Sequence, residues 1–407
     1  MQPMPGDRHA TGPTGRQSYL SWRTDTPDST LERGAYVESH PVKVLHVLNE
    51  LKPSGAERML RLAAVPWLRD GLELEVLSTG SEPGPYAATL AEAGYVVHHI
   101  PLYPVHRFLT GYRRLLRDSR FTVVHVHPER ANFLLAMMAR ISGRAGVVRT
   151  VHNVFGFQGR LRLERRVQRA ILRRAGVLHV SVGQSVAAME RENFGNPTVV
   201  VRNTFDETRF RPASEAERRQ ARAEFDVAAE QLLAVVVGNC SEVKNHQALI
   251  RAVALPSASA FRVLHVGLEG AAATHERRLV EELGLGDRVQ FLGYIDDVPR
   301  LLHAADAFVM PSLYEGLSIA ALETLACGLP SVFADVPGLC DLRPHVPDAW
   351  WIAPEPEPIA IALGEIATMS AEERLRWSSE TAATIRREFA VDQHVRDYLE
   401  IYRKVAA

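Results

Sequence analysis

"AFVMPSLYEGLSIAALETLACGLPSVFAD" (residues 307–335) contains two short apolar runs separated by a stretch with helical character. The runs at 307–312 and 330–335 have the length and composition of buried strands. The stretch between them begins after Ser318, a residue type that favours the N-cap of a helix. Two short apolar runs joined by a helix are typical of parallel strands covered by helices, so this stretch predicts an α/β fold.

The same alternation continues along the chain from residue 43. Apolar runs predict a first series of strands at 43–50, 74–79, 95–100, 122–127, 147–153, 177–183 and 198–203. A second series is predicted at 232–239, 262–268, 288–294, 307–312, 330–335 and 350–354. Helical stretches separate the strands in both series. The pattern therefore predicts two tandem Rossmann-like domains, each a parallel sheet with helices on both faces.

The periodicity breaks near residues 203–215 and suggests how the chain divides. We expect a first domain at 41–205, a second at 206–380, and a charged helical end at 381–407 that packs back on the first domain. Residues 1–40 are rich in Gly, Pro, Ser, Thr and charge, which predicts a disordered tail. Ligands bind at the carboxyl ends of parallel strands, so two facing sheets predict a deep cleft between the domains as the site.

Composition excludes several classes of protein. The 407 residues include 47 Lys and Arg and 48 Asp and Glu, so no global charge excess points to nucleic acid. No apolar run reaches the roughly 18 residues of a membrane span. The three cysteines, Cys240, Cys327 and Cys340, have no metal-ligand spacing in the sequence, which predicts a reduced cytoplasmic protein without disulfides or a metal site.

Two glutamates, Glu315 and Glu323, lie eight positions apart in the opening stretch. Eight helical residues rise about 12 Å, more than the roughly 5–10 Å that separates the carboxyl groups of a glycosidase pair. Glu323 shares a helix stripe with apolar residues, so its carboxylate needs hydrogen bonds from vicinal sugar hydroxyls or from a structural arginine. The spacing favours two contacts on one long ligand.

Two further segments follow predicted strands and are suited to binding phosphate. Gly55 precedes a helix and lets the backbone approach an anion, although Ser54 and Glu57 also have the spacing of a simple capping box. Lys244 precedes a helix start, where a cation is unfavourable unless a diphosphate lies between them. A plain surface lysine is the alternative for Lys244.

Histidines end two neighbouring strands of the first series. His125 and His127 share one face of their strand, and His127 is nearer the carboxyl end. His152 ends the next strand. We assign His127 to the cleft and His152 to the acceptor side, with buried core histidines as the alternative.

An arginine-rich helix is predicted at 160–176. Its arginines lie at 160, 162, 165, 166, 169, 173 and 174, and its apolar side consists of Leu161, Leu163, Val167, Ala170 and Ile171. A solvated basic face is one interpretation. The other is contact with anionic lipid headgroups or a phosphorylated acceptor, for which we assign Arg165, Arg166 and Arg169.

Several motifs together resemble those of the retaining nucleotide-sugar glycosyltransferases of family 4, which have the two-domain GT-B fold. They are GAE, HVHPE, RTVHN, VVRNTFDETRF, VGNCSEVKNHQALI, ERRLVEELGLGDRVQFLGYIDDVPRLLHAADAFVMPS and EGLSIAALE, between about residues 43 and 345. Two positions depart from the family pattern. Asn239 stands where many members have arginine, and Asn203-Thr204 replaces an Asn-Gly pair.

The resemblance implies a role for each matching residue. Glu315 would contact the donor sugar, Glu323 the ribose hydroxyls, and His127 would lie near the transferring carbon. Lys244 and the backbone of Gly316, Leu317 and Ser318 would bind the diphosphate, with Gly55 across the cleft and the backbone of Tyr294 and Ile295 at the base. It implies a retaining, metal-independent hexosyltransferase with no cofactor beyond its nucleotide-sugar co-substrate.

The expected reaction moves a sugar from a nucleotide-diphosphate sugar to a saccharide or lipid-linked acceptor hydroxyl in envelope polysaccharide, lipopolysaccharide or glycolipid synthesis. We expect a cytoplasmic protein that meets the anionic inner face of the membrane. A nucleotide-sugar epimerase or hydrolase, or a non-catalytic nucleotide-sugar-binding subunit, stays open as an alternative. The sequence leaves the base, the sugar and the acceptor unspecified, because pocket shape selects them.

Overall fold

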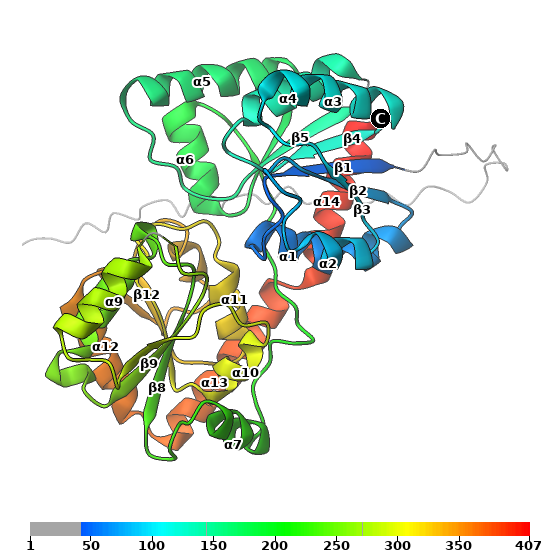
Figure 1. Ribbon diagram of the computed structural model, residues 1–407. Helices are drawn as coiled ribbons and strands as arrows, with labels where there is room; N and C mark the ends of the chain where they lie inside the picture. The colour runs from blue at the N-terminus through cyan, green and yellow to red at the C-terminus, as the bar shows by residue number, and fades with distance from the viewer. Residues whose placement is uncertain (1–41, 144, 271) are drawn as a thin grey trace, which may run out of the picture. The chain divides into compact units, whose positions relative to one another are not determined.

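The computed structural model of the protein describes residues 42–143, 145–270 and 272–407 (Figure 1). The tail predicted at residues 1–40 lies outside the described residues. Two parallel sheets with interleaved helices form the described part, as the sequence predicts. Each predicted apolar run overlaps a strand.

The first sheet has seven parallel strands in the order β3-β2-β1-β4-β5-β6-β7. Alternate residues of its central strand face different cores: Val44 and Leu48 pack on one side, and Leu45 and Val47 pack on the other. This two-sided burial explains the nearly continuous apolar runs in the sequence. The strands are β1 (Lys43–Leu48), β2 (Glu73–Ser78), β3 (Val96–His99), β4 (Val123–Val126), β5 (Gly146–Val151), β6 (Leu178–Ser181) and β7 (Val199–Val200).

The second sheet has six parallel strands in the order β10-β9-β8-β11-β12-β13. Phe308 and Val309, neighbours on β11, belong to cores on opposite faces of this sheet. The strands are β8 (Leu232–Val237), β9 (Phe261–Val266), β10 (Val289–Phe291), β11 (Ala307–Met310), β12 (Ser331–Ala334) and β13 (Trp350–Ile352).

Helices follow most of the strands. Those around the first sheet are α1 (Gly55–Arg69), α2 (Ala87–Glu92), α3 (Val105–Asp118), α4 (Asn132–Ser142), α5 (Gly159–Arg174) and α6 (Gln184–Phe194). Those around the second are α7 (Glu215–Glu224), α8 (His246–Val253), α9 (Ala273–Glu282), α10 (Val298–Ala304), α11 (Ile319–Ala326) and α12 (Pro356–Thr368), with 3-10 turns η1 (Glu242–Lys244), η2 (Pro256–Ala258) and η3 (Cys340–Leu342). Within the described residues, no helix is long and apolar enough to cross a membrane.

The C-terminal helices return the chain to the first sheet. Helix α13 (Ala371–Glu388) leads into α14 (Val391–Ala406), drawn in red, which packs on α1, β4 and β5 (Figure 1). Tyr398 and Tyr402 of α14 lie in the same apolar cluster as Trp67 of α1. The Trp67 indole donates a hydrogen bond to the Val395 carbonyl at 3.2 Å. The predicted packing of the closing helix on the first sheet is confirmed.

The segment between β7 and α7 carries one departure from the family pattern. Asn203 donates from Nδ2 to the Leu317 carbonyl at 2.7 Å. The Thr204 hydroxyl donates to the Phe389 carbonyl at 2.6 Å. The φ angle of Thr204 is not positive, so this position does not require glycine. The replacement of the usual Asn-Gly pair is therefore accommodated by two side-chain anchors.

The strand order reverses direction at one point in each sheet. In the first sheet β1 lies between β2 and β4, and in the second β8 lies between β9 and β11. The loops after the two strands at such a switch point leave in opposite directions and open a crevice at the carboxyl edge. The two strands at the switch point are β1 and β4 in the first sheet and β8 and β11 in the second. The motifs around Gly55, His127, Lys244 and Glu315 follow these four strands in that order.

Candidate functional site

One cavity of about 670 Å³ lies at the carboxyl ends of these four central strands. Its volume is within the range of small-molecule sites. Loops from both sheets contribute to its wall. The predicted residues that line it are Gly55, His127, His152, Lys244, Tyr294, Ile295, Glu315, Gly316, Leu317, Ser318 and Glu323.

A lysine and a carboxylate from two different loops meet in the cavity. Lys244 Nζ donates to Glu315 Oε1 at 2.6 Å, and the Ser312 hydroxyl donates to the same oxygen at 2.7 Å. The Lys244 stem passes over Gly238, where an added Cβ would come within 3.3 Å of it. Lys244 is thus held by an anion in front of the start of α8 and is not a free surface lysine.

The start of α11 forms the adjacent wall. Ser318 caps this helix, because its hydroxyl accepts from the Ala321 amide at 3.4 Å, as predicted. Gly316 precedes the cap, and a Cβ there would lie 2.1 Å from the His152 carbonyl oxygen. A Cβ on Gly55 would lie 3.1 Å from Ile319 Cδ1. At both positions the absence of a side chain lets a segment that follows a strand of the first sheet approach a segment that follows a strand of the second.

Glu323 is buried on α11 and has an arginine partner. Arg58 Nη1 of α1 lies 3.5 Å from Glu323 Oε1. Burial raises the pKa of Glu323 to about 7, and Arg58 opposes that rise only in part. The sequence reasoning anticipated an arginine but did not identify Arg58. The only feature of the sequence that points to Arg58 is its position directly after the Gly-Ala-Glu motif.

The Ser54 and Glu57 pair does not form the capping box that its spacing allows. Ser54 precedes α1 without a side-chain bond to a helix amide. Its hydroxyl donates instead to the Glu57 carboxylate. Burial raises the pKa of Glu57, and the Ser54 hydrogen bond partly offsets this. The capping-box interpretation is therefore wrong, and Ser54 leaves the amides at this helix start without a side-chain cap.

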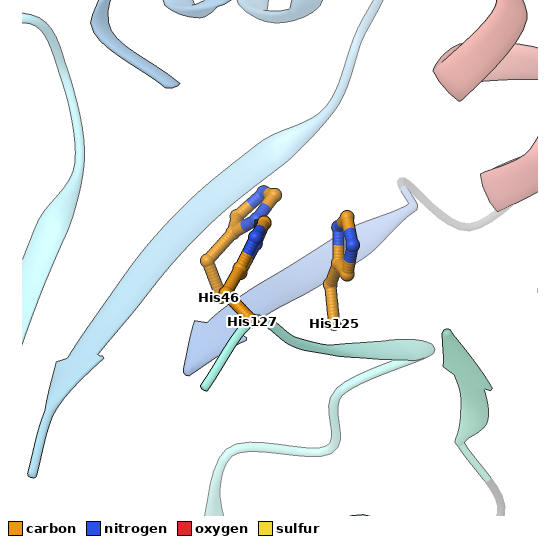
Figure 2. A group of neighbouring side chains, drawn as sticks. All are labelled: His46, His125 and His127. Atoms are coloured by element: carbon orange, nitrogen blue, oxygen red, sulfur yellow. Dashed lines mark hydrogen bonds between the residues drawn. The ribbon is translucent and has the colours of Figure 1, made fainter. Parts of the chain in front are cut away.

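Three histidines form a hydrogen-bonded row that leads to the cavity. His46 Nδ1 lies 3.1 Å from His127 Nε2, and His127 Nδ1 lies 3.0 Å from His152 Nε2. Figure 2 shows the rings of His46, His125 and His127 beside one another. His46, on β1, was missed because it looks like a polar interruption in an apolar strand. It is fully buried and contacts His127 only because β1 pairs with β4.

His125, the remaining histidine of this group, is part of the core. His125 is buried and hydrogen-bonded to the Tyr402 hydroxyl at 2.8 Å and to the Thr150 hydroxyl at 2.7 Å. The core interpretation therefore applies to His125, whereas His127 and His152 face the cavity. Burial lowers the pKa of His127 far below its usual value and that of His152 to about 4. The imidazoles on this wall are neutral at pH 7 and act as hydrogen-bonding groups.

The arginine assignments require a correction. Arg169 of α5 is buried, and its Nη2 donates to Glu190 Oε1 at 2.7 Å and to Glu129 Oε1 at 3.1 Å. A guanidinium enclosed by two carboxylates is a structural ion pair, so the prediction that Arg169 meets an acceptor or membrane was wrong. Arg165 is half-buried, with Nη1 donating to the Gln168 side chain at 2.9 Å, and Arg166 is exposed.

The apolar residues of α5 also differ from a simple core-facing stripe. Leu161, Leu163, Val167 and Ile171 are 42%, 63%, 50% and 40% exposed. Leu172 and Arg169 are the buried positions of this helix. Helix α5 therefore presents two leucines, a valine and an isoleucine among exposed arginines.

Family models match both halves of the described chain. The model for "Glycosyl transferase 4-like domain" matches residues 54–204, and the model for "Glycosyl transferases group 1" matches residues 217–383. The first match covers the Gly55, His127 and His152 segments. The second covers the Lys244, Glu315 and Glu323 segments.

Individual proteins match over long stretches. EpsF of Bacillus subtilis (strain 168), whose name describes a glycosyltransferase, is 27% identical over 316 residues, which are 74% of this chain and 80% of EpsF. An Escherichia coli protein named UDP-Gal:alpha-D-GlcNAc-diphosphoundecaprenol alpha-1,3-galactosyltransferase is 24% identical over 257 residues, 59% of this chain and 64% of that protein. Anabaena HepE, crystallised with UDP-glucose, superposes with a TM-score of 0.76 at 21% identity over 89% of this chain and 99% of HepE.

Proposed function

Because this chain belongs to the GT-B glycosyltransferases of the family 4 type, we propose that its cavity binds a nucleotide-diphosphate sugar and transfers the sugar to an acceptor hydroxyl. The observation that carries this proposal is the contact between Lys244 and Glu315 at 2.6 Å beside the α11 start. It supplies a cation, an acceptor of sugar hydroxyl hydrogen bonds and the amides of a helix start in one place. The UDP-glucose bound by HepE supports a donor of this class.

The donor lies along the second-sheet wall in this proposal. Its diphosphate bonds Lys244 and the backbone of Gly316, Leu317 and Ser318, because a helix start favours an anion. Glu315 bonds the sugar and Glu323 bonds the ribose hydroxyls. The base lies against the backbone of Tyr294 and Ile295. Residues 206–380 then form the donor domain, and residues 41–205 form the acceptor domain with His127 near the transferring carbon.

Transfer proceeds with retention at the anomeric carbon and without a metal ion. The bond from this carbon to the diphosphate oxygen breaks while the acceptor oxygen bonds on the same face. The leaving diphosphate accepts the acceptor proton, so no protein nucleophile is required. Lys244 and the α11 amides stabilise the charge that develops on the diphosphate, which is the task that a metal performs in other transferases.

A direct test changes Glu315. Glu315→Ala removes the sugar contact but leaves Lys244 free for the diphosphate, so we expect transfer to fall about 100-fold while donor affinity changes little. Transfer is measured with a labelled nucleotide sugar and an envelope extract of the source organism. The exposed Glu281→Ala is the matched control. Undiminished transfer by Glu315→Ala, or equal turnover without any acceptor, would reject the proposal.

The acceptor is a saccharide or lipid-linked molecule, and α5 contacts the anionic membrane surface that carries it. Exposed Leu161 and Leu163 beside exposed Arg160 and Arg166 have the composition of a helix that lies in a headgroup layer. The diphosphoundecaprenol in the name of the E. coli relative supports an acceptor of this class. The proposed reaction then belongs to the synthesis of an envelope polysaccharide, lipopolysaccharide or glycolipid.

Liposome sedimentation tests the membrane contact. We expect the protein to sediment with vesicles that contain anionic lipid and to lose this binding in Arg160→Gln/Arg166→Gln, with each arginine worth about 1 kcal/mol. The control Arg219→Gln/Arg278→Gln removes the same charge from exposed positions on α7 and α9. Equal sedimentation of both double variants contradicts this assignment.

A further inference from the structure

Four buried side chains with metal-ligating atoms gather on the second sheet, outside the residues that line the cavity. They are Cys240 after β8, His246 at the start of α8, His265 on β9 and Glu276 on α9. Their exposed fractions are 4%, 3%, 2% and 1%. A thiol, two imidazoles and a carboxylate are rarely brought together in an apolar core without a shared partner.

Three of these side chains bring possible ligand atoms together, and the fourth, Glu276, contacts His246. One ligand atom from each of Cys240, His246 and His265 lies within 4.8 Å of the others. His246 Nδ1 lies 3.3 Å from Glu276 Oε1. Cys240 Sγ lies 3.8 Å from His265 Nε2, the ring nitrogen that faces a backbone carbonyl. Tetrahedral zinc with bonds of about 2.0 Å to nitrogen or oxygen and about 2.3 Å to sulfur separates its ligands by roughly 3.3–3.6 Å. The separation between His246 Nδ1 and Glu276 Oε1 lies in this range.

One imidazole of the cluster has an unpaired nitrogen. His265 Nε2 lies 2.8 Å from the Gly238 carbonyl, which requires a proton on that nitrogen. Its Nδ1 is buried and has no hydrogen-bond partner among the described residues. A backbone carbonyl on one ring nitrogen and a free lone pair on the other is the usual arrangement of a metal-bound histidine.

Charge distinguishes this cluster from the other group of histidines. His46, His125 and His127 also bring ligand atoms together, but both nitrogens of His125 are hydrogen-bonded to hydroxyls. Three imidazoles offer no negative charge to a buried dication. Cys240 and Glu276 offer a thiolate and a carboxylate, which together neutralise a dication.

We propose that Cys240, His246, His265 and Glu276 bind one divalent transition-metal ion of the zinc class as a structural site. Without a cation, burial and the neighbouring Glu276 raise the pKa of the Cys240 thiol to about 12, so metal binding releases its proton. The sequence concealed the site because its ligands follow a Cys-x5-His-x18-His-x10-Glu spacing that matches no short metal motif.

The proposed site lies directly behind the loop that carries Lys244. Cys240 and His246 flank η1 (Glu242–Lys244), and Gly238 and Asn239 before it line the cavity. A metal ion would tie both ends of this loop to β9 and α9. It would therefore hold Lys244 in place without touching the donor, in keeping with a metal-independent transfer step.

Cobalt titration of the metal-free, untagged full-length protein tests the site. We expect one equivalent of Co²⁺ to bind with the absorption of a tetrahedral ion and a thiolate charge-transfer band, and one equivalent of Zn²⁺ to displace it. Zn²⁺ is also expected to raise the unfolding temperature. Cys240→Ser removes the thiolate band, and Glu276→Gln weakens Co²⁺ binding more than about 100-fold, beyond the effect of changing an outer partner.

Cys340→Ser is the matched control, since this thiol lies on η3 and its hydrogen bond goes to Asp335. Its cobalt spectrum should equal that of the unchanged protein. Absence of the thiolate band in the unchanged protein, or an equal band in Cys240→Ser, overturns the proposal. If Cys240→Ser does not fold, Glu276→Gln decides, and unchanged Co²⁺ affinity in that variant also overturns it. None of these readouts requires sugar transfer, so the result is independent of the proposed function.

Discussion

The two walls of the cavity differ in charge. The second-sheet wall carries Lys244, Glu315 and Glu323, which are ionisable groups held by one another or by Arg58. The first-sheet wall carries His127 and His152, whose pKa values are lowered by burial and by neighbouring imidazoles or Arg149. We call Lys244, Glu315 and Glu323 the charged wall, and His127 and His152, which are neutral at pH 7, the neutral wall. Arg58 and the other ionisable residues at the start of α1 line the cavity from the first sheet and belong to neither set.

This difference indicates a division of work. A diphosphate leaving group needs fixed positive charge, which the second-sheet wall supplies. An acceptor hydroxyl and the hydroxyl groups of the transferred sugar need positioned hydrogen bonds, and a cationic imidazole there would compete with Lys244 for the phosphate. Substitutions on the charged wall should therefore have larger effects than substitutions on the neutral wall.

The largest effect is expected for Lys244→Met, which keeps the stem over Gly238 but removes the charge. We expect kcat/KM for transfer to fall about 100- to 1,000-fold, comparable to the loss of one preorganised donor to a developing anion. Steady-state kinetics with saturating acceptor measure it. Lys404→Met, at an exposed position of α14, is the control. A loss below about threefold would mean that the helix amides alone stabilise the diphosphate.

A smaller effect is expected for His127→Ala on the neutral wall. The loss of one hydrogen bond to a reacting, partly charged group predicts a fall in kcat/KM of about tenfold to a hundredfold. Because burial holds the pKa of His127 well below its usual value, the imidazole stays neutral and the factor should be constant between pH 6 and 8. His127→Gln should recover part of the rate, and exposed His106→Ala should have no effect. A factor that changes across this pH range contradicts a neutral imidazole.

Local features of the fold could be predicted from the sequence because they depend on short-range patterns. The apolar runs placed β11 and β12, and the residue type of Ser318 placed the start of α11. The residues of the charged wall were also found, since each follows a strand in a recognisable motif. These positions are determined by strand ends, which the sequence marks directly.

The missed residues depend on contacts between distant segments. Arg58 reaches Glu323 across 265 positions, and His46 reaches His127 through the pairing of β1 with β4. Arg169 looked like one of seven similar arginines, but Glu190 on α6 and Glu129 bury its guanidinium. Helical periodicity alone does not show which face of α5 meets α6. The same limit applied to Cys240, whose neighbours come from three other elements.

The smallest of these effects concerns Glu323, the group of the charged wall that titrates near neutrality. Burial raises its pKa from an ordinary 4.5 to about 7, so its protonated form is favoured in the folded protein. Its contribution to the free energy of unfolding is then greatest below pH 4.5 and is lost as the pH rises through 7. Glu323→Gln should abolish this decline in thermal unfolding, whereas exposed Glu281→Gln should keep it.

Donor binding should depend on the same carboxyl group, but donor affinity should rise with pH, whereas stability falls. Ribose hydroxyls donate to the ionised form, so binding should release a proton and become about tenfold tighter from pH 6 to pH 8, as the ionised fraction rises around a pKa of about 7. Calorimetry in two buffers of different ionisation enthalpy, with the nucleotide sugar that most stabilises the protein, measures both quantities. In Glu323→Gln the proton release and the pH dependence should disappear together. If the affinity of Glu323→Gln still rises with pH as in the unchanged protein, another group titrates on donor binding, and the ribose contact of Glu323 is wrong.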